Sequence, residues 1–463
     1  MALGVTSDQG PSRSAPTDLG TVIVAPFQAA AKAALTTHEL FLLDHYIQRF
    51  SRIYPTCSGP MNPFLSILLP LAVENQTVMN AVLALSGAQL GAHRDQEIIK
   101  ATLCARHRAL EGCRNILIYS ESLMDSNQSR PTGRSMAGTG NHGNILYTLA
   151  SCICLLLYEK LMGDGKANWM PHLSFLAGLF DRLETPHNQE VFQSILRGHQ
   201  QRLAFGFIHN LFLYNDLVQS TAQGTSTLSN FYLRPQGMSS VRQPGSGKSL
   251  FNGILDTSLV PGDLSSRDRF YYPYLIAQIS AGTETVSDAS IGLWDSRLDW
   301  LPSFSVLTVP RSPGSEITRS VDTDQSSQVN EPDHIFLMSA IYSYTAKLYL
   351  RQTRCRRQGQ NAMSQCGLEI ADLACHATFL ISQVPDGSSF ENALLWPIGI
   401  IGPGLSAASS PSRQYLLTRL RSLEQRFQMK HFERLQEVLV AGWNRLDRMD
   451  SEELVENDVF LFG

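Results

Sequence analysis

Residues 245–249 (GSGKS) are the one stretch of the chain that resembles a catalytic motif. A phosphate-binding loop has the pattern G-x-x-x-x-G-K-[ST] and lies between a strand and a helix. Here Arg242 occupies the first glycine position, the residues before it do not form an apolar strand, and Gly253 interrupts the residues after it. We therefore interpret the stretch as a loop and predict no nucleotide-binding site.

Cysteine and histidine, the side chains that most often bind transition metals, are scattered along the chain. None of the eight cysteines forms a C-x-x-C pair, so neither a zinc site nor a thioredoxin-like redox site is predicted. Cys152 and Cys154 lie in an apolar segment, and we interpret them as packing residues in a reducing compartment. None of the twelve histidines has ligand spacing: His38 and His45 are too far apart for one metal ion, and His172 is expected to pack or cap.

Two carboxylate pairs on expected helices are the remaining candidates for acid–base chemistry. They are Glu39 with Asp44, and Asp447 with Asp450, and we predict solvated surface for both. No G-x-S-x-G nucleophile motif occurs. We therefore predict no catalytic, cofactor-binding or metal-binding residue, and we expect that the protein is not an enzyme.

The densest basic cluster lies in the sequence RQTRCRRQGQ and consists of Arg351, Arg354, Arg356 and Arg357. At a helix C-terminus, cations interact favourably with the helix dipole. No aromatic residues interleave with these arginines, as they would in a surface that binds single-stranded nucleic acid. We prefer the dipole explanation to an import signal or a nucleic-acid patch.

Composition indicates an ordinary globular protein with a large core. The chain has 463 residues, of which 43% are hydrophobic and 17% charged. A net charge of −4 argues against a phosphate-neutralising surface over the whole chain. The first 20 residues lack the apolar run of a signal peptide, and no membrane association is expected.

The stretch at residues 145–162 (ILYTLASCICLLLYEKLM) is the best candidate for the centre of the fold, and its first 14 residues, 145–158, carry no charge. A helix that is apolar all round must be enclosed by other helices or by lipid. Spanning a bilayer takes roughly 18 or more apolar residues, and strands usually have roughly 4–8. We therefore predict a core helix with amphipathic helices packed around it.

Helical periodicity covers most of the remaining chain. Residues 1–34 are predicted to be a disordered tail. Thr36 and Glu39 match a capping box, and Asn62-Pro63 matches a helix start. Apolar spacing predicts further helices, while residues 120–143, 220–269 and 302–333 are expected to be irregular. Over residues 35–463 the predicted fold is all-α: a large array of helix pairs around a buried central helix, with long irregular loops.

The order of several core motifs resembles the fungal-specific transcription factor domain. Near the start, residues 42–54 (LLDHYIQRFSRIY) and 61–90 carry the likeness, and the helix with Ala105, His107, Ala109 and Leu110 continues it. Trp169, His172 and Leu173 look like the family's Trp-x-x-His-Leu helix. A closing segment matches at Leu395, Trp396, Pro397, Gly399, Gly402, Arg413, Leu420, Leu435 and Trp443. The likeness covers residues 36–220 and 334–448.

The resemblance implies an all-helical, nuclear regulator of transcription. The family's DNA reader is a six-cysteine cluster that holds two zinc ions, whereas residues 1–35 of this chain contain no cysteine. We therefore expect a regulator or co-regulator that acts through other transcription regulators, for instance a zinc-cluster factor, rather than by direct DNA binding. By analogy with the family, its targets would be a secondary-metabolite gene set.

Two other functions stay open on the sequence alone. A large helical core can hold an apolar cavity for a small-molecule effector. Trp169, Trp396 and Trp443 could line such a cavity, although core packing is their commoner role. An enzyme built on the same scaffold is the third reading, because sites assembled only in space are invisible in one sequence. Oligomeric state cannot be read from these residues.

Overall fold

A computed structural model describes residues 35–54, 62–90, 95–126, 141–163, 168–183, 198–223, 228, 331–358, 363–388 and 390–448. Within these ranges the chain is helical and has no strand, which confirms the predicted all-α fold. The predicted tail, residues 1–34, lies outside the described residues, as do GSGKS and most of the two stretches predicted to be irregular beyond residue 219.

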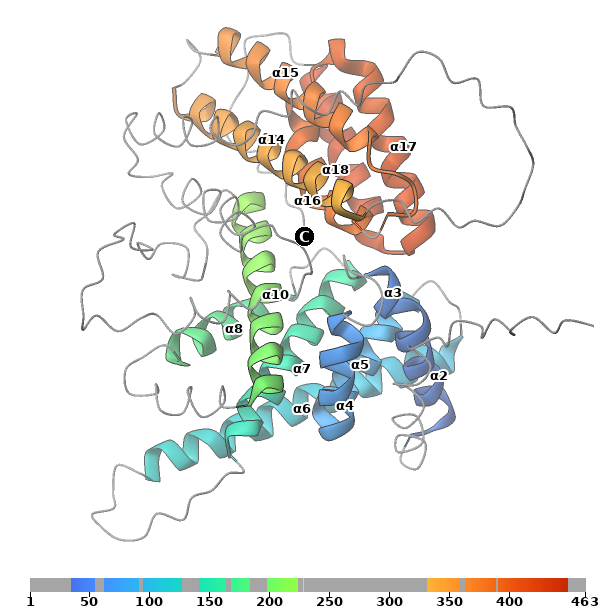
Figure 1. Cartoon of the computed structure of the whole chain (residues 1–463), viewed down its shortest axis with the longest axis vertical. Coiled ribbons are helices and arrows are strands. Elements are labelled where there is room, and N and C mark those ends of the chain that lie inside the picture. Colours follow the sequence, from blue (N-terminus) through green and yellow to red (C-terminus); the bar gives the residue numbers. More distant parts are fainter. Residues whose placement is uncertain are drawn as a thin grey trace, which may run out of the picture.

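The helices form two groups, one above the other in Figure 1. We call them the N-terminal lobe and the C-terminal lobe. The N-terminal lobe contains α2 (Thr37–His45), η1 (Tyr46–Phe50), α3 (Ser51–Ile53), η3 (Phe64–Leu68), α4 (Leu69–Glu74), α5 (Gln76–Gln89), α6 (Gln96–Ser126), α7 (Asn141–Met162), α8 (Met170–Leu183) and α10 (His199–Gln223). The C-terminal lobe contains α14 (Glu331–Gln358), α15 (Met363–Ser382), η8 (Glu391–Leu394), α16 (Leu395–Ile401), η9 (Gly402–Gly404), η10 (Ala407–Ser409), α17 (Ser410–Phe427) and α18 (Lys430–Leu446).

Helix α7 is the predicted central helix, and the structure confirms its position. It packs against α5, α6, α8 and α10 of its own lobe and against α18 of the other. The side chains from Ile153 to Leu157 are fully buried. By length and composition the window Ile145–Met162 would also pass as a membrane span, but 78% of it is buried inside the protein. Other helices therefore supply the enclosure that this apolar segment requires.

Local signals set several helix ends as predicted. The Thr36 hydroxyl accepts from the Glu39 backbone N–H at 3.3 Å, and the Glu39 carboxylate accepts from the Thr36 N–H at 2.9 Å. The Asn62 side chain accepts from the Phe64 N–H at 3.0 Å. Helix α7 ends at Met162, and the φ of 59° at the following Gly163 suits a residue without a Cβ.

Some predicted boundaries were wrong. Residues 120–143 were expected to be a loop, but α6 continues to Ser126 and α7 already begins at Asn141. Helix α10 ends at Gln223 and α14 begins at Glu331, so both enter stretches predicted to be irregular. The polar residues there signalled a loop. At the end of α10, however, Ser220 and Thr221 are buried, and their hydroxyls donate to the Leu217 carbonyl at 2.9 and 3.0 Å, so the helix itself satisfies them.

The enclosure of α7 predicts a large cost for removing a side chain from it. Leu156→Ala should lower the free energy of unfolding by about 2–5 kcal/mol, because Leu156 is fully buried and its neighbours cannot close the cavity completely. Leu368→Ala is the matched control, since Leu368 is 73% exposed, and should change stability by under about 0.5 kcal/mol. Urea unfolding of the purified variants measures both. Equal losses would contradict the central position of α7.

Candidate functional site at the lobe junction

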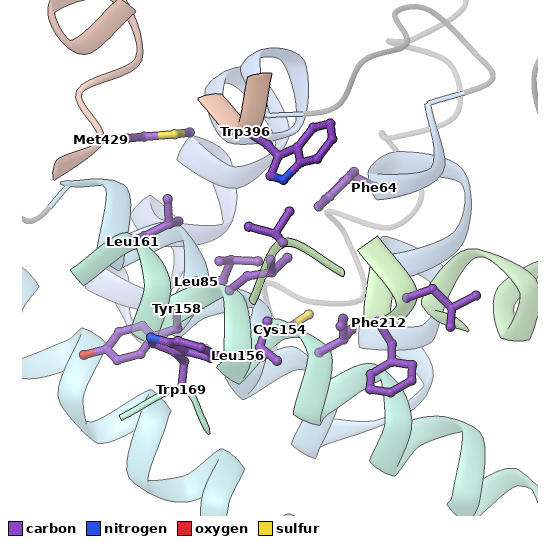
Figure 2. Packing of buried hydrophobic residues seen from close by; sticks show 14 of the residues in the cluster. Phe64, Leu85, Cys154, Leu156, Tyr158, Leu161, Trp169, Phe212, Trp396 and Met429 are labelled. Atoms are coloured by element: carbon purple, nitrogen blue, oxygen red, sulfur yellow. The ribbon is translucent and has the colours of Figure 1, made fainter. Parts of the chain in front are cut away.

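The two lobes meet through a small set of hydrogen bonds between residues distant in sequence. The indole Nε1 of Trp396 donates to the Thr221 hydroxyl at 2.9 Å. The Asn392 amide donates to the Tyr54 carbonyl at 2.9 Å, and the Gln89 amide donates to the Phe427 carbonyl at 3.0 Å. Trp396 and Met429 of the C-terminal lobe lie at one side of the packed cluster that contains Leu161 and Phe64 (Figure 2). The junction is thus apolar and pinned by a few polar contacts.

A cleft of about 80 Å³ opens at this junction. Both lobes contribute to its walls. The lining residues are Tyr54, Lys160, Leu161, Tyr214, Asn215, Val218, Asn392, Leu395, Trp396, His431, Arg434 and Leu435. Drug-sized ligands occupy pockets of roughly 300–1,000 Å³, so this cleft fits a much smaller group.

Three basic side chains line the cleft, and no carboxylate does: Lys160 comes from α7, and His431 and Arg434 come from the first turns of α18. The Lys160 ammonium lies 5.0 Å from the centre of the Trp169 ring. Burial lowers the pKa of Lys160 to about 8, so the amine is still mostly protonated at neutral pH. The cleft therefore has a positive potential.

His431 is the neutral member of this set. Burial, and after it the charge of Lys160, lowers the pKa of His431 to about 3. Its Nε2 is buried and has no hydrogen-bond partner among the described residues. A buried polar atom of this kind costs free energy unless a further group satisfies it.

Two tyrosines complete the polar lining. Burial raises the pKa of Tyr54, and the neighbouring Tyr214 raises it further. Burial also raises the pKa of Tyr214, although its hydrogen bond with Tyr342 acts in the opposite direction. Both hydroxyls therefore keep their protons at neutral pH and can donate hydrogen bonds.

Of the three tryptophans considered for a cavity, the structure places one at the cleft. Trp396 lines it. Trp169 lies behind Lys160 and contacts the ammonium. Trp443 donates to the Gly402 carbonyl at 2.9 Å inside the C-terminal lobe, where it is a packing residue.

The prediction that Glu39 is solvated was wrong. Glu39 is 5% exposed and is bound by Arg108 of α6, whereas Asp44 is exposed as expected. Asp447 accepts from the Arg413 guanidinium at 2.8 Å, and Asp450 lies outside the described residues. Because a buried carboxylate needs a partner, the fold brings an arginine from another helix to Glu39.

Two other buried carboxylates are also paired. The Glu159 carboxylate accepts from Arg106 Nε at 2.7 Å, and Glu391 is bound by Arg419 at 3.0 Å and by Arg426. Arg106 and Arg108 are both on α6. They bridge to α7 and α2, because buried acids on those helices require them.

Among the described residues, no group of three or more His, Cys, Asp or Glu side chains is suitable for a metal ion. His38 is exposed, while the His45 Nδ1 lies 3.0 Å from the Ser86 hydroxyl. Burial, and then the charge of Arg106, lowers the pKa of His172 to about 4, which fits a neutral packing residue.

Cys152 and Cys154 are buried as predicted. Cys152 Sγ lies 4.0 Å from Cys113 Sγ of α6. In the basic cluster, Arg351 pairs with Glu369 of α15 at 2.9 Å, which the sequence did not indicate. The side chains of the other three arginines lie outside the described residues.

Comparison with known proteins gives one match. A family model described as fungal specific transcription factor domain matches residues 41–256 and 310–458. These two stretches cover more than half of the chain and include both lobes. No curated protein and no solved structure matches the chain.

The hydrogen bond between Trp396 and Thr221 should couple the lobes measurably. Trp396→Phe and Thr221→Val should each destabilise the protein, and the double variant should lose less than the sum by about 1 kcal/mol. Trp443→Phe is the matched control, because its indole donates within one lobe, and it should not couple to Thr221→Val. Urea unfolding of the parent protein, the two single variants and the double variant measures this coupling free energy. A coupling indistinguishable from that control would show that the bond does not join the lobes.

Buried histidines should make the fold sensitive to acid. His209 lies with its ring centre 4.8 Å from that of Phe180, and burial lowers its pKa to about 3. In the unfolded chain, histidine has a pKa near 6.5. Between pH 6.5 and about 3, the unfolded chain therefore binds more protons at this residue than the folded chain does. The free energy of unfolding thus falls as the pH drops through this window. By pH 5, His209 alone should account for a loss of about 2 kcal/mol.

His209→Phe tests this origin of the acid sensitivity. Phenylalanine keeps the aromatic contacts but cannot bind a proton. Between pH 7 and pH 5, the free energy of unfolding should therefore fall by about 2 kcal/mol less in the variant than in the parent, as measured by urea unfolding. Identical losses would show that His209 does not contribute.

Proposed function

Because the chain belongs to the fungal specific transcription factor domain family, we propose that it regulates transcription of a biosynthetic gene set in a filamentous fungus. A secondary-metabolite gene cluster is the proposed target. The protein would act in the nucleus through contacts with other regulators, including a zinc-cluster factor that reads the DNA. The family match over both lobes is the observation that carries this proposal.

The surface of the C-terminal lobe supports a role in protein contacts. Leu368 and Phe379 are 73% and 59% exposed, and both lie on α15. Their spacing of three helical turns puts them on one face of that helix. Exposed apolar side chains on one helix face are among the groups that a protein partner can cover, and we propose that these two take part in such a contact.

The arrangement of ionisable groups supports regulation over catalysis. Four carboxylates are buried among the described residues: Glu39, Glu159 and Glu391 are held by arginines, and Asp216 accepts from the Leu228 backbone N–H at 2.8 Å. Each of them therefore already has a partner. The cleft at the junction is also far smaller than a typical substrate pocket.

Deleting the gene and sequencing the transcripts tests the proposal. We expect altered expression of a co-located set of biosynthetic genes, restored by the wild-type gene. Complementation with the double variant Leu368→Ala/Phe379→Ala should restore expression only in part, because the exposed face is lost while the core stays intact. Complementation with Val440→Ala, a truncation of an apolar side chain 38% exposed on α18, is the control and should restore it fully. An unchanged transcript profile in the deletion strain would reject the regulatory role.

A further inference from the structure

We propose that the cleft at the lobe junction binds a small organic anion, with a carboxylate or phosphate head group held by Lys160 and Arg434 and a flat apolar body against Trp396. The proposal concerns the purified protein and stands whether or not the transcriptional role does. It rests on the charges that line the cleft, on a buried imidazole nitrogen without a partner, and on the apolar walls.

Four acids adjoin lining residues in the sequence, and none of them lines the cleft. Asp216 follows Asn215 and accepts from the Leu228 backbone N–H at 2.8 Å, and Glu433 precedes Arg434 and is exposed. Glu159 precedes Lys160, yet its carboxylate turns to Arg106. Glu391 precedes Asn392, yet its carboxylate is held by Arg419 and Arg426. No ion pair to Lys160 or Arg434 is formed within the described part of the chain. Two cations thus face one small cleft without a counter-ion, which an anion from solution would supply.

Hydrogen-bond donors surround the same space. The planar guanidinium of Arg434 can donate two parallel hydrogen bonds to a carboxylate or a phosphate, and the ammonium of Lys160 provides a compact positive charge. The unpartnered Nε2 of His431 and the Tyr54 hydroxyl lie in the same lining. In its neutral Nε2–H tautomer, the buried imidazole would donate a hydrogen bond to the anion.

The remaining walls and the volume limit the kind of anion. Trp396, Leu161 and Leu435 are apolar and come from both lobes. At about 80 Å³ the cleft is smaller than the roughly 150 Å³ cavity that accommodates benzene. The head group would therefore be enclosed, while the part of the ligand body beyond Trp396 stays outside the cleft.

Isothermal titration of the full chain at constant ionic strength tests the site with three probes. Benzoate carries a carboxylate on a flat ring, inorganic phosphate carries the other head group, and benzamide is the neutral match of benzoate. Binding of benzoate alone, or of phosphate alone, supports the site and identifies its head group. Binding of neither anion, or equal binding of benzamide and benzoate, overturns the proposal.

Variants locate the binding. Lys160→Gln and Arg434→Gln should each lower the affinity for the anion by about tenfold or more, because each removes one charge-assisted hydrogen bond. Arg434→Lys should retain part of the affinity. Arg421→Gln removes an exposed arginine of α17 and should change nothing. Unfolding temperatures of the ligand-free variants identify any that fail to fold, and equal affinity in Arg434→Gln and Arg421→Gln would overturn the proposal.

The pH dependence supplies a second readout. The titratable or charged groups lining the cleft are Tyr54, Lys160, Tyr214, His431 and Arg434. Because the pKa of Lys160 is lowered to about 8, anion affinity should fall as the pH rises through 8, while arginine stays charged. In Lys160→Gln this fall should disappear. A fall of the same size in that variant would show that Lys160 does not hold the anion.

Discussion

The enclosure of α7 is the constraint on which the other features of this fold depend. A helix that carries apolar side chains on every face is soluble only when neighbours cover all of them. Helices α5, α6, α8 and α10 cover most of α7, and α18 reaches its C-terminal end from the other lobe. The lobe junction is therefore part of the same requirement, because the last turn of α7 carries both Leu161, which needs cover, and Lys160, which needs access to water.

Ion pairs hold the surrounding helices at fixed positions around that core. Glu39 on α2 and Glu159 on α7 both reach to α6, where Arg108 and Arg106 bind them. Glu391 is held in the C-terminal lobe by two arginines of α17. A buried pair adds little net stability, yet removing one partner is costly. These pairs thus fix which helices lie side by side more than they strengthen the fold.

Features that depend on neighbouring residues could be predicted from the sequence, and those that depend on distant ones could not. The capping box of Thr36 and Glu39 is local, and so is the apolar run of α7. The partner of Glu39 is on another helix, so its burial was missed. The cleft was also missed, because its walls come from segments far apart in the chain. One signal was available: His431 and Arg434 are three residues apart, which places them on one face of a helix, and Lys160 lies near the end of the apolar stretch 145–162.

The junction between the lobes belongs to a single polypeptide, and this has a consequence for how firmly it must close. Residues 224–330 connect α10 to α14, so the two halves remain at a high effective concentration even when their contacts part. The hydrogen bond from Trp396 to Thr221 therefore acts between groups that are never free to diffuse apart. Buried apolar side chains of both halves also belong to one core cluster, so packing and covalent continuity act together at the seam.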